Sequence, residues 1–400
     1  MLLYNTLSQN KEEFRSLKKN QTSIYVCGIT PYDTTHLGHA FVYISFDVLI
    51  RFLEYKGIKV SYTQNVTDIN DRDNDILKRA KEQNIPWQDL SKLWTQRFLD
   101  DMRKLNWRKP DNYLYASQNI RKMADFVQKL IDKGLAYRVD ASVYLDISRI
   151  KDYGKLSRLN RIEMLKIAKD YEEDVGNPDK KHPLDITLWR KSDPRQPSHI
   201  PSFESPFGKG RPGWHVECSV MAIMSLGERI DIHGGGRDLI FPHHEAEIAQ
   251  SEGATGKKPF AQIWMHSGII SYGGEKMSKS LGNLILVSNL LEKYDPSHIR
   301  FMLLSNHYRK DWDFDYSKIE GAKIKFGTIE KALSTKIPPT EYSKNNIIDK
   351  FESLMENDLD TPGVLNLVYS ASLDILSGKE KSRALQGDIK KILRVLGFAV

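Results

Sequence analysis

Two histidines and two lysines, far apart in the chain, are the residue types best suited to act on a polyphosphate. His36 and His39 follow a short apolar run and a turn, and apolar residues at helical spacing begin at about His39. Both imidazoles should therefore lie at a helix N-terminus, where unpaired N–H groups and partial positive charge favour phosphate. Lys276 and Lys279 lie three residues apart, just after two glycines. We expect these four side chains to stabilise charge on a reacting nucleotide.

A second nucleotide-binding pattern follows a strand predicted over residues 230–232. Gly235 and Gly236 allow the backbone to approach a purine or its ribose, and Asp238 can accept hydrogen bonds from ribose hydroxyls. The alternative is a plain glycine turn with a solvated aspartate. Because of the neighbouring motifs we favour ATP binding, and we assign Gly38, between the two histidines, to the same ligand.

Four side chains could bind a metal ion. Cys27 and Cys218 are the only cysteines, and each adjoins one of these motifs. His243 and Glu247 are four residues apart at the start of a predicted helix, which places them on one face. Two thiolates, an imidazole and a carboxylate make a tetrahedral zinc set. The residues alone also fit two small buried cysteines beside an acidic helix cap.

Composition and charge exclude several classes of protein. The chain has 400 residues and 40% hydrophobic content, which is enough for a large core and two or three domains. No apolar run approaches the about 20 residues that span a membrane, and two distant cysteines make no disulfide framework. We therefore expect a soluble cytoplasmic protein. The formal net charge of +7 permits a polyanionic partner such as RNA.

The elements that must position these residues predict a doubly wound α/β fold. A strand near 24–26, a helix from about 39 and a strand over 59–66 make a strand–helix–strand unit, the start of a parallel sheet. The second half is predicted to return with a helix at 219–226 and strands at 230–232 and 260–270. From residue 287 onward apolar residues recur at helical spacing. The last four helices predicted in this region are expected to form an antiparallel bundle, and they are 317–335, 345–357, 362–377 and 384–396.

The chain resembles the class I aminoacyl-tRNA synthetases because H-L-G-H at 36–39 precedes K-M-S-K-S at 276–280. The surrounding segments narrow the resemblance to the cysteinyl-tRNA synthetase family. It runs from about residue 3 to the end. The segments that carry it are Y-V-C-G-I-T-P-Y-D, N-V-T-D-I-N-D, G-R-P-G-W-H-V-E-C-S, H-G-G-G-R-D-L-I-F-P-H-H-E-A-E and W-M-H-S-G.

This resemblance implies an enzyme that activates L-cysteine with ATP, as the Mg²⁺ complex of the nucleotide, and transfers the cysteinyl group to tRNA(Cys). It implies one zinc ion per chain, which selects the substrate thiol over a serine hydroxyl and does not activate water. The implied zinc ligands are Cys27, Cys218, His243 and Glu247, and the implied amino-acid pocket includes Thr67, Trp214 and His215.

The same resemblance implies a Rossmann-like catalytic domain that is interrupted by an insertion and followed by a helical bundle. We expect the chain to act as a monomer. We divide the chain into five parts: a first catalytic half (1–99), a connective insertion (100–213), a second catalytic half (214–286), a helical stem-contact region (287–316) and a helical bundle (317–400). The second catalytic half contains the segment K-M-S-K-S at 276–280, which we call the lysine loop.

The acceptor of the activated cysteine has two candidates. Typical members of the family continue into a small anticodon-reading domain, whereas this sequence stops after the predicted bundle. The related cysteine ligase of mycothiol biosynthesis also stops there and shares T-P-Y-D-T-T-H-L-G-H-A, so an amino sugar is the alternative acceptor. We favour tRNA because the basic charge suits RNA, the insertion is large enough to guide an acceptor end, and Glu247 with I-A-Q-S-E resembles the tRNA enzymes.

Two hypotheses come from other classes of protein. A non-catalytic paralogue that binds a nucleotide or RNA conflicts with motifs that are intact. A simple nucleotidyltransferase of the H-x-G-H type would have no need for Cys27, Cys218 and the loop at 276–280 together.

Overall fold

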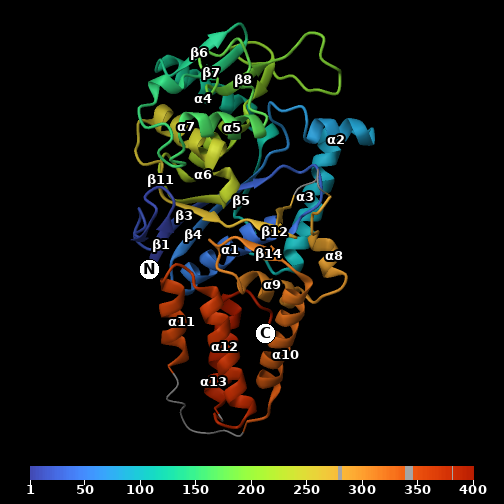
Figure 1. Cartoon of the computed structure of the whole chain (residues 1–400). Coiled ribbons are helices and arrows are strands. Elements are labelled where there is room, and N and C mark those ends of the chain that lie inside the picture. Colours follow the sequence, from blue (N-terminus) through green and yellow to red (C-terminus); the bar gives the residue numbers. More distant parts are fainter. Residues whose placement is uncertain (278–281, 338–345, 381) are drawn as a thin grey trace.

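A parallel five-stranded sheet forms the centre of the molecule (Figure 1). The computed structural model describes residues 1–277, 282–337, 346–380 and 382–400. The strand order β11-β10-β3-β4-β5 and the parallel pairing of all neighbours confirm the predicted α/β fold. These strands are β3 (Gln21–Ile29), β4 (Lys59–Val66), β5 (Asn112–Tyr115), β10 (Ile230–Gly236) and β11 (Ala261–Ser267).

Helix α1 (Leu37–Tyr55) connects β3 to β4 and packs against the sheet. It begins two residues earlier than the spacing predicted, because the His36 side chain caps it by accepting a hydrogen bond from the backbone N–H of His39. Most of its apolar side chains are buried, Phe46 and Phe52 completely. The helix is therefore fixed by its core face, and its N-terminus is left at the edge of the sheet.

The segment proposed as an insertion contains one strand of the main sheet. β5 pairs in parallel with β4, and the proposed boundary at residue 100 falls inside α3 (Trp87–Lys104). The first half of the sheet thus extends to Tyr115, which places the start of the insertion later than residue 100. No strand was predicted at β5, because four residues at a sheet edge are too short for a clear alternation of apolar and polar side chains.

The remaining part of the insertion forms a second layer above the main sheet (Figure 1). Its four strands make a separate antiparallel sheet in the order β6-β7-β8-β9. Helix α4 packs against two helices of the second catalytic half, α6 (Trp214–Leu226) and α7 (Glu245–Thr255). The elements are α4 (Ile120–Asp132), β6 (Ala136–Val139), β7 (Ser142–Leu145), α5 (Arg161–Asp170), β8 (Ile186–Lys191) and β9 (Gly210–Pro212). Ahead of α3 lies α2 (Ile76–Gln83).

The second half differs from its prediction in two places. Helix α6 (Trp214–Leu226) begins five residues earlier than predicted, directly after Gly213. The strand predicted over 260–270 is broken after β11, which ends at Ser267, and at the next residue, Gly268, a side chain would meet the carbonyl oxygen of Lys310 at 2.2 Å. The chain then forms β12 (Ile270–Tyr272) in another sheet, between β13 (Glu275–Lys276) and β14 (Trp312–Phe314).

The C-terminal part is helical as predicted except for β14, which pairs with β12, and its last four helices pack together at the lower end of Figure 1. Arg300 on α9 is buried and joins this part to the catalytic half, because its guanidinium pairs with Asp47 of α1 and donates to the carbonyl oxygens of Leu105 and Leu396. The helices are α8 (Val287–Leu291), α9 (Pro296–Leu304), α10 (Tyr316–Ser334), α11 (Ile347–Glu356), α12 (Thr361–Leu376) and α13 (Arg383–Val395).

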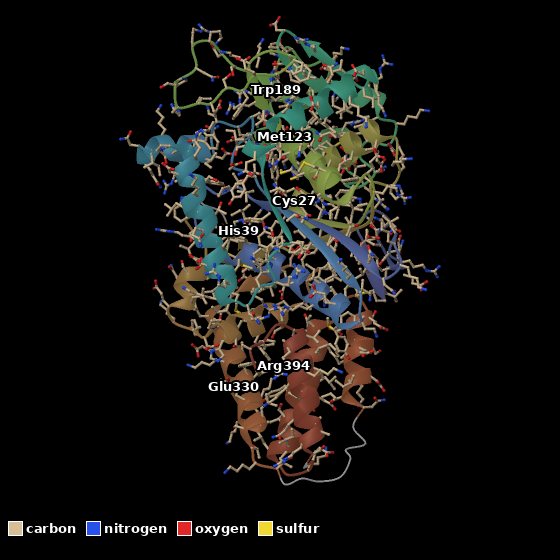
Figure 2. All side chains as sticks on the ribbon, turned by 180° about the vertical axis from the view of Figure 1, so that it is seen from behind. Cys27, His39, Met123, Trp189, Glu330 and Arg394 are labelled. Atoms are coloured by element: carbon tan, nitrogen blue, oxygen red, sulfur yellow. The ribbon has the colours of Figure 1, made fainter. Side chains whose placement is uncertain are left out.

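A short hairpin completes the fold: β1 (Leu2–Asn5) and β2 (Asn10–Glu13) pair beside β11, with α7 (Glu245–Thr255) further along the catalytic half. Seen from behind, Cys27 and His39 lie at the level of the main sheet, between the layer that holds Trp189 and the bundle that holds Arg394 (Figure 2). Among the described residues, no helix combines the length and the apolar character needed to cross a bilayer.

Candidate active site and metal centre

A cavity of about 650 Å³ opens at the carboxyl ends of β3, β4 and β10. In open α/β sheets ligands bind at this edge, where the strand order reverses. The cavity walls bring together most of the residues that the sequence singled out. They are Cys27, His36, Gly38, His39, Thr67, Trp214, Cys218, Gly236, Asp238, His243 and Lys276.

The two histidines form one rim of the cavity. Their rings stack with centroids 3.7 Å apart, and His36 Nδ1 accepts a hydrogen bond from the His39 backbone N–H at 3.4 Å. A side chain at Gly38 would meet the His36 ring at 2.9 Å, so a glycine here keeps room for the imidazole. Both rings consequently lie at the N-terminus of α1, as the spacing predicted.

The chain that follows the lysine loop is tied to the same rim. The backbone N–H of Leu37 donates to the Ile285 carbonyl at 2.8 Å, and that of Val287 donates to the Thr35 carbonyl at 2.9 Å. Residues 285–287 thus run beside the start of α1. These contacts explain how two motifs more than two hundred residues apart in the sequence come to share one cavity.

The predicted ATP ligands divide into two groups. Gly236 and Asp238 line the cavity, and Lys276 Nζ lies 3.4 Å from Asp238 Oδ2 across it. Gly235 faces inward instead: a side chain there would meet Leu239 at 2.9 Å and the His244 ring at 3.2 Å. Lys279 lies outside the described residues, so its assignment stays a prediction.

The four predicted metal ligands come together from separate segments. Donor atoms of Cys27, Cys218, His243 and Glu247 all lie within 4.8 Å of one another, and all four residues are buried. The Glu247 carboxylate oxygen Oε1 is 3.2 Å from His243 Nε2 and 3.3 Å from Cys27 Sγ. β3, α6, the turn before α7 and α7 itself each supply one ligand.

The electrostatics of this cluster fit a bound cation. Burial raises the pKa of the Cys27 and Cys218 thiols, raises the pKa of Glu247 to about 8 and lowers the pKa of His243. Without a positive ion, the buried donors are therefore driven to their neutral forms. A divalent ion would reverse this for the acidic groups, and S₂NO donors at this spacing suit zinc.

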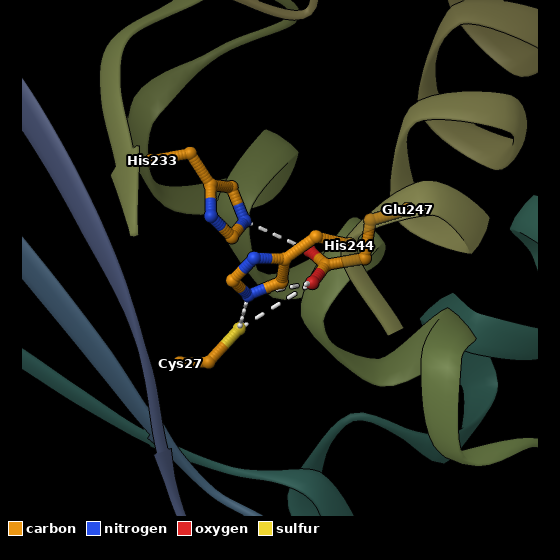
Figure 3. A group of neighbouring side chains, drawn as sticks. All are labelled: Cys27, His233, His244 and Glu247. Carbon is orange, nitrogen blue, oxygen red and sulfur yellow. Dashed lines mark hydrogen bonds and ion pairs between the residues drawn. The ribbon is translucent and has the colours of Figure 1, made fainter. Parts of the chain in front are cut away.

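Two histidines that the sequence did not single out, His233 and His244, lie against Cys27 and Glu247 (Figure 3). His233 Nε2 lies 2.9 Å from Glu247 Oε2, and His244 Nε2 lies 3.3 Å from Cys27 Sγ. With Cys27 and Glu247 they form a second group whose donor atoms lie within 4.8 Å. His244 in turn contacts His266 at 2.7 Å. His233 lies in the middle of the buried strand β10, and a histidine in such a strand was the signal that could have indicated this role.

The predicted amino-acid pocket is partly changed by the structure. Thr67 accepts a hydrogen bond from the Asn65 side chain at 3.0 Å and, like Trp214, lines the cavity. His215 is only 2% exposed and does not line it. Its ring lies behind His243, with 2.8 Å between the two Nδ1 atoms. His215 is therefore not placed to contact a substrate in the cavity directly.

Arg72 and Glu173 are site residues that sequence reasoning missed. The Arg72 guanidinium lies 3.8 Å above the Trp214 ring and donates to Glu173 Oε1 at 3.0 Å. The same oxygen lies 3.0 Å from His215 Nε2. Although burial opposes ionisation, His215 and Arg72 lower the pKa of Glu173 to about 2, so this carboxyl is ionised at neutral pH. Both residues lie in loops without periodicity, where a sequence pattern carries no signal.

Comparisons with known proteins first define the class. The family described as "tRNA synthetases class I (C) catalytic domain" matches residues 13–324. The methionyl-tRNA synthetase of Mycobacterium tuberculosis in complex with methionyl-adenylate aligns with a TM-score of 0.66, over 94% of this chain and 88% of that chain, at 15% identity. That likeness shows the fold, which is the catalytic fold of a class I synthetase.

Curated relatives narrow the class to one family. A cysteine–tRNA ligase of Dehalococcoides mccartyi is 41% identical over 408 residues, covering 100% of this chain and 87% of the relative. That of Thermococcus onnurineus is 42% identical over 386 residues, covering 92% of this chain and 79% of the relative. The chain belongs to the cysteine–tRNA ligase family, which confirms the resemblance found in the sequence.

Proposed function

We propose that this chain activates L-cysteine with ATP as cysteinyl-adenylate and transfers the cysteinyl group to tRNA(Cys). The observation that carries the proposal is a single cavity that joins two chemistries. One side holds the two stacked histidines and Lys276, and the other holds two buried thiols beside His243. A phosphate-binding rim next to a soft-metal cluster suits a substrate that has both a carboxylate to activate and a thiol to recognise.

Cys27, Cys218, His243 and Glu247 would hold the zinc ion. When bound there, zinc supplies a soft Lewis acid that coordinates a substrate thiolate far better than it coordinates a serine hydroxyl. Three of the four ligands line the cavity, whereas Glu247 lies beneath them, so the open side of the cluster faces the space for the amino acid. Recognition of this kind rejects serine without a separate editing site.

The rim residues would bind ATP as its Mg²⁺ complex. Asp238 accepts hydrogen bonds from the ribose, while His36, His39 and Lys276 contact phosphate oxygens, and Lys279 is proposed to join them. The cysteine carboxylate attacks the α-phosphorus, a bond forms between that oxygen and phosphorus, and pyrophosphate leaves. Such in-line displacement depends on positioning and on positive charge aimed at the transition state.

The insertion would guide the acceptor end of the tRNA. Tyr171 and Asp170, at the end of α5, line the cavity together with residues of both catalytic halves. The layer above the sheet thus reaches the mouth where an acceptor must enter. We keep the five-part division of the chain as a proposal, with the insertion now starting after Tyr115.

Two assays test the function. Cysteine-dependent exchange of pyrophosphate into ATP should be seen, and serine should support little exchange. Radiolabelled cysteine should then appear on total tRNA as an ester that mild base removes. If the purified enzyme instead formed a base-stable amide with glucosaminyl-inositol and left tRNA uncharged, the acceptor would be an amino sugar and the adenylate chemistry would stand. Absence of cysteine-dependent exchange would contradict the proposal as a whole.

A further inference from the structure

We propose that Glu173 is a positioning residue: it fixes the proton of His215, and His215 in turn presents the Nε2 atom of His243 unprotonated to the metal centre. This inference deepens the proposed function and rests on its metal site. Nothing in the family resemblance assigns Glu173, which comes from the insertion and not from either catalytic half.

Three contacts in series carry the proposal. Glu173 Oε1 lies 3.0 Å from His215 Nε2, and His215 Nδ1 lies 2.8 Å from His243 Nδ1. The opposite nitrogen of the second ring, His243 Nε2, faces the cluster and lies 3.2 Å from Glu247 Oε1. His215 and His243 are buried, so water has little access to exchange these partners.

The direction of hydrogen bonding follows from the carboxylate. An ionised carboxylate only accepts, so His215 Nε2 must carry the proton that it donates to Glu173. A metal ion on His243 Nε2 leaves the proton of that ring on Nδ1, so His243 donates from Nδ1–H and His215 must accept at its own Nδ1. The remaining lone pair of His243 is on Nε2, the atom that faces the metal cluster. With the opposite order of protons, His243 Nε2 would be protonated and could not bind a metal.

Arg72 holds the first member of the series in place. Its guanidinium donates to the same Glu173 oxygen at 3.0 Å and stacks on Trp214, which lines the cavity. The carboxylate is thus kept ionised and oriented by a cation that cannot lose its proton.

The series that runs through His244 and His266 has no such fixed direction. His244 contacts His266 at 2.7 Å, and His266 contacts the hydroxyl of Thr6 at 2.8 Å. A hydroxyl can donate or accept, so that series does not determine which ring nitrogen is protonated. Of the two histidine series, only the one that ends at Glu173 has its proton positions set by the charge of a carboxylate.

The test measures tautomers and metal affinity separately. In zinc-loaded wild-type protein, ¹⁵N NMR of labelled histidine should show His215 protonated on Nε2 only and His243 protonated on Nδ1. Glu173→Ala should remove this preference and weaken zinc binding in a chelator competition by about 10- to 100-fold, the usual cost of losing an outer-shell partner. Glu173→Gln should restore most of the affinity, because its amide oxygen can still accept from His215.

Glu172→Ala is the matched control. Its carboxylate accepts from the Asn74 side chain at 3.2 Å on the surface, so the neighbouring change should leave zinc affinity and both tautomers unaltered. The proposal is overturned if His215 lacks a proton on Nε2 or carries one on Nδ1 in the zinc-loaded wild type, or if Glu173→Ala binds zinc as the wild type does. The first measurement needs no variant and therefore stands even if Glu173→Ala fails to fold. A wild type without zinc affinity would contradict the proposed function instead.

Discussion

The ammonium group of Lys276 lies 3.4 Å from the carboxylate of Asp238. Lys276 is the last residue of β13 and Asp238 follows β10, and both side chains line the cavity, so this ion pair joins two parts of its wall. Both side chains are about half exposed, and such a pair contributes little to stability. A nucleotide that offers phosphate to Lys276 and ribose to Asp238 would replace one weak contact with two directed ones.

Removing this lysine should slow adenylate formation. Lys276→Ala is expected to cost about 2–4 kcal/mol of transition-state stabilisation, the range for one preorganised electrostatic contact. The KM for cysteine should change little, since the lysine addresses phosphate. Pyrophosphate exchange measures both quantities, and Lys257→Ala, on an exposed lysine, is the control. Unchanged exchange in a double Lys276→Ala, Lys279→Ala variant would show that the loop has no catalytic role.

Metal removal should abolish cysteine activation. We expect one zinc ion per chain by elemental analysis, and loss of exchange activity when a strong chelator removes it. Cys27→Ser and Cys218→Ser should each lower the zinc content, because a hydroxyl is a poor replacement for a buried thiolate ligand. Full activation of cysteine by the metal-free protein would contradict thiol recognition by zinc, whatever the metal content of the variants.

Salt should separate the two half-reactions. If several phosphate contacts hold tRNA, the logarithm of kcat/KM for transfer should fall linearly with the logarithm of salt concentration, since binding releases counterions. Cysteine-dependent pyrophosphate exchange should respond much less over the same range. Equal salt dependence of both reactions would argue against a polyanionic acceptor.

The buried pair of Arg300 and Asp47 should matter for stability. Arg300→Met leaves the Asp47 carboxylate buried beside the remaining donors Arg51 and Arg108, and loss of one member of a buried pair typically costs about 3–5 kcal/mol. Urea unfolding followed by circular dichroism measures this cost. Arg15→Ala, which removes an exposed pair with Glu13, should leave the midpoint unchanged. A similar midpoint for both variants would show that Arg300 does not hold the two parts together.

The sequence could predict those parts of the site that depend on local pattern. His36 and His39 lie at a helix start, and His243 and Glu247 share a face, because both relationships follow from turn and helix geometry. The partners that lie in loops could not be predicted, since Glu173 reaches His215 only through tertiary packing. Strand β5 was missed for a similar reason: its place in the sheet is decided by its neighbour β4.

The position of β3 also sets the order in which the protein can be completed during synthesis. Its neighbour β4 begins at Lys59, whereas its other neighbour β10 begins at Ile230. Distant strand pairing forms late, and chains emerge from the ribosome N-terminus first. The four residues of the proposed zinc site are therefore complete only once Glu247 has been made. Metal capture at the proposed site would then be among the last steps of folding, and it would join the early half of the chain to the late half.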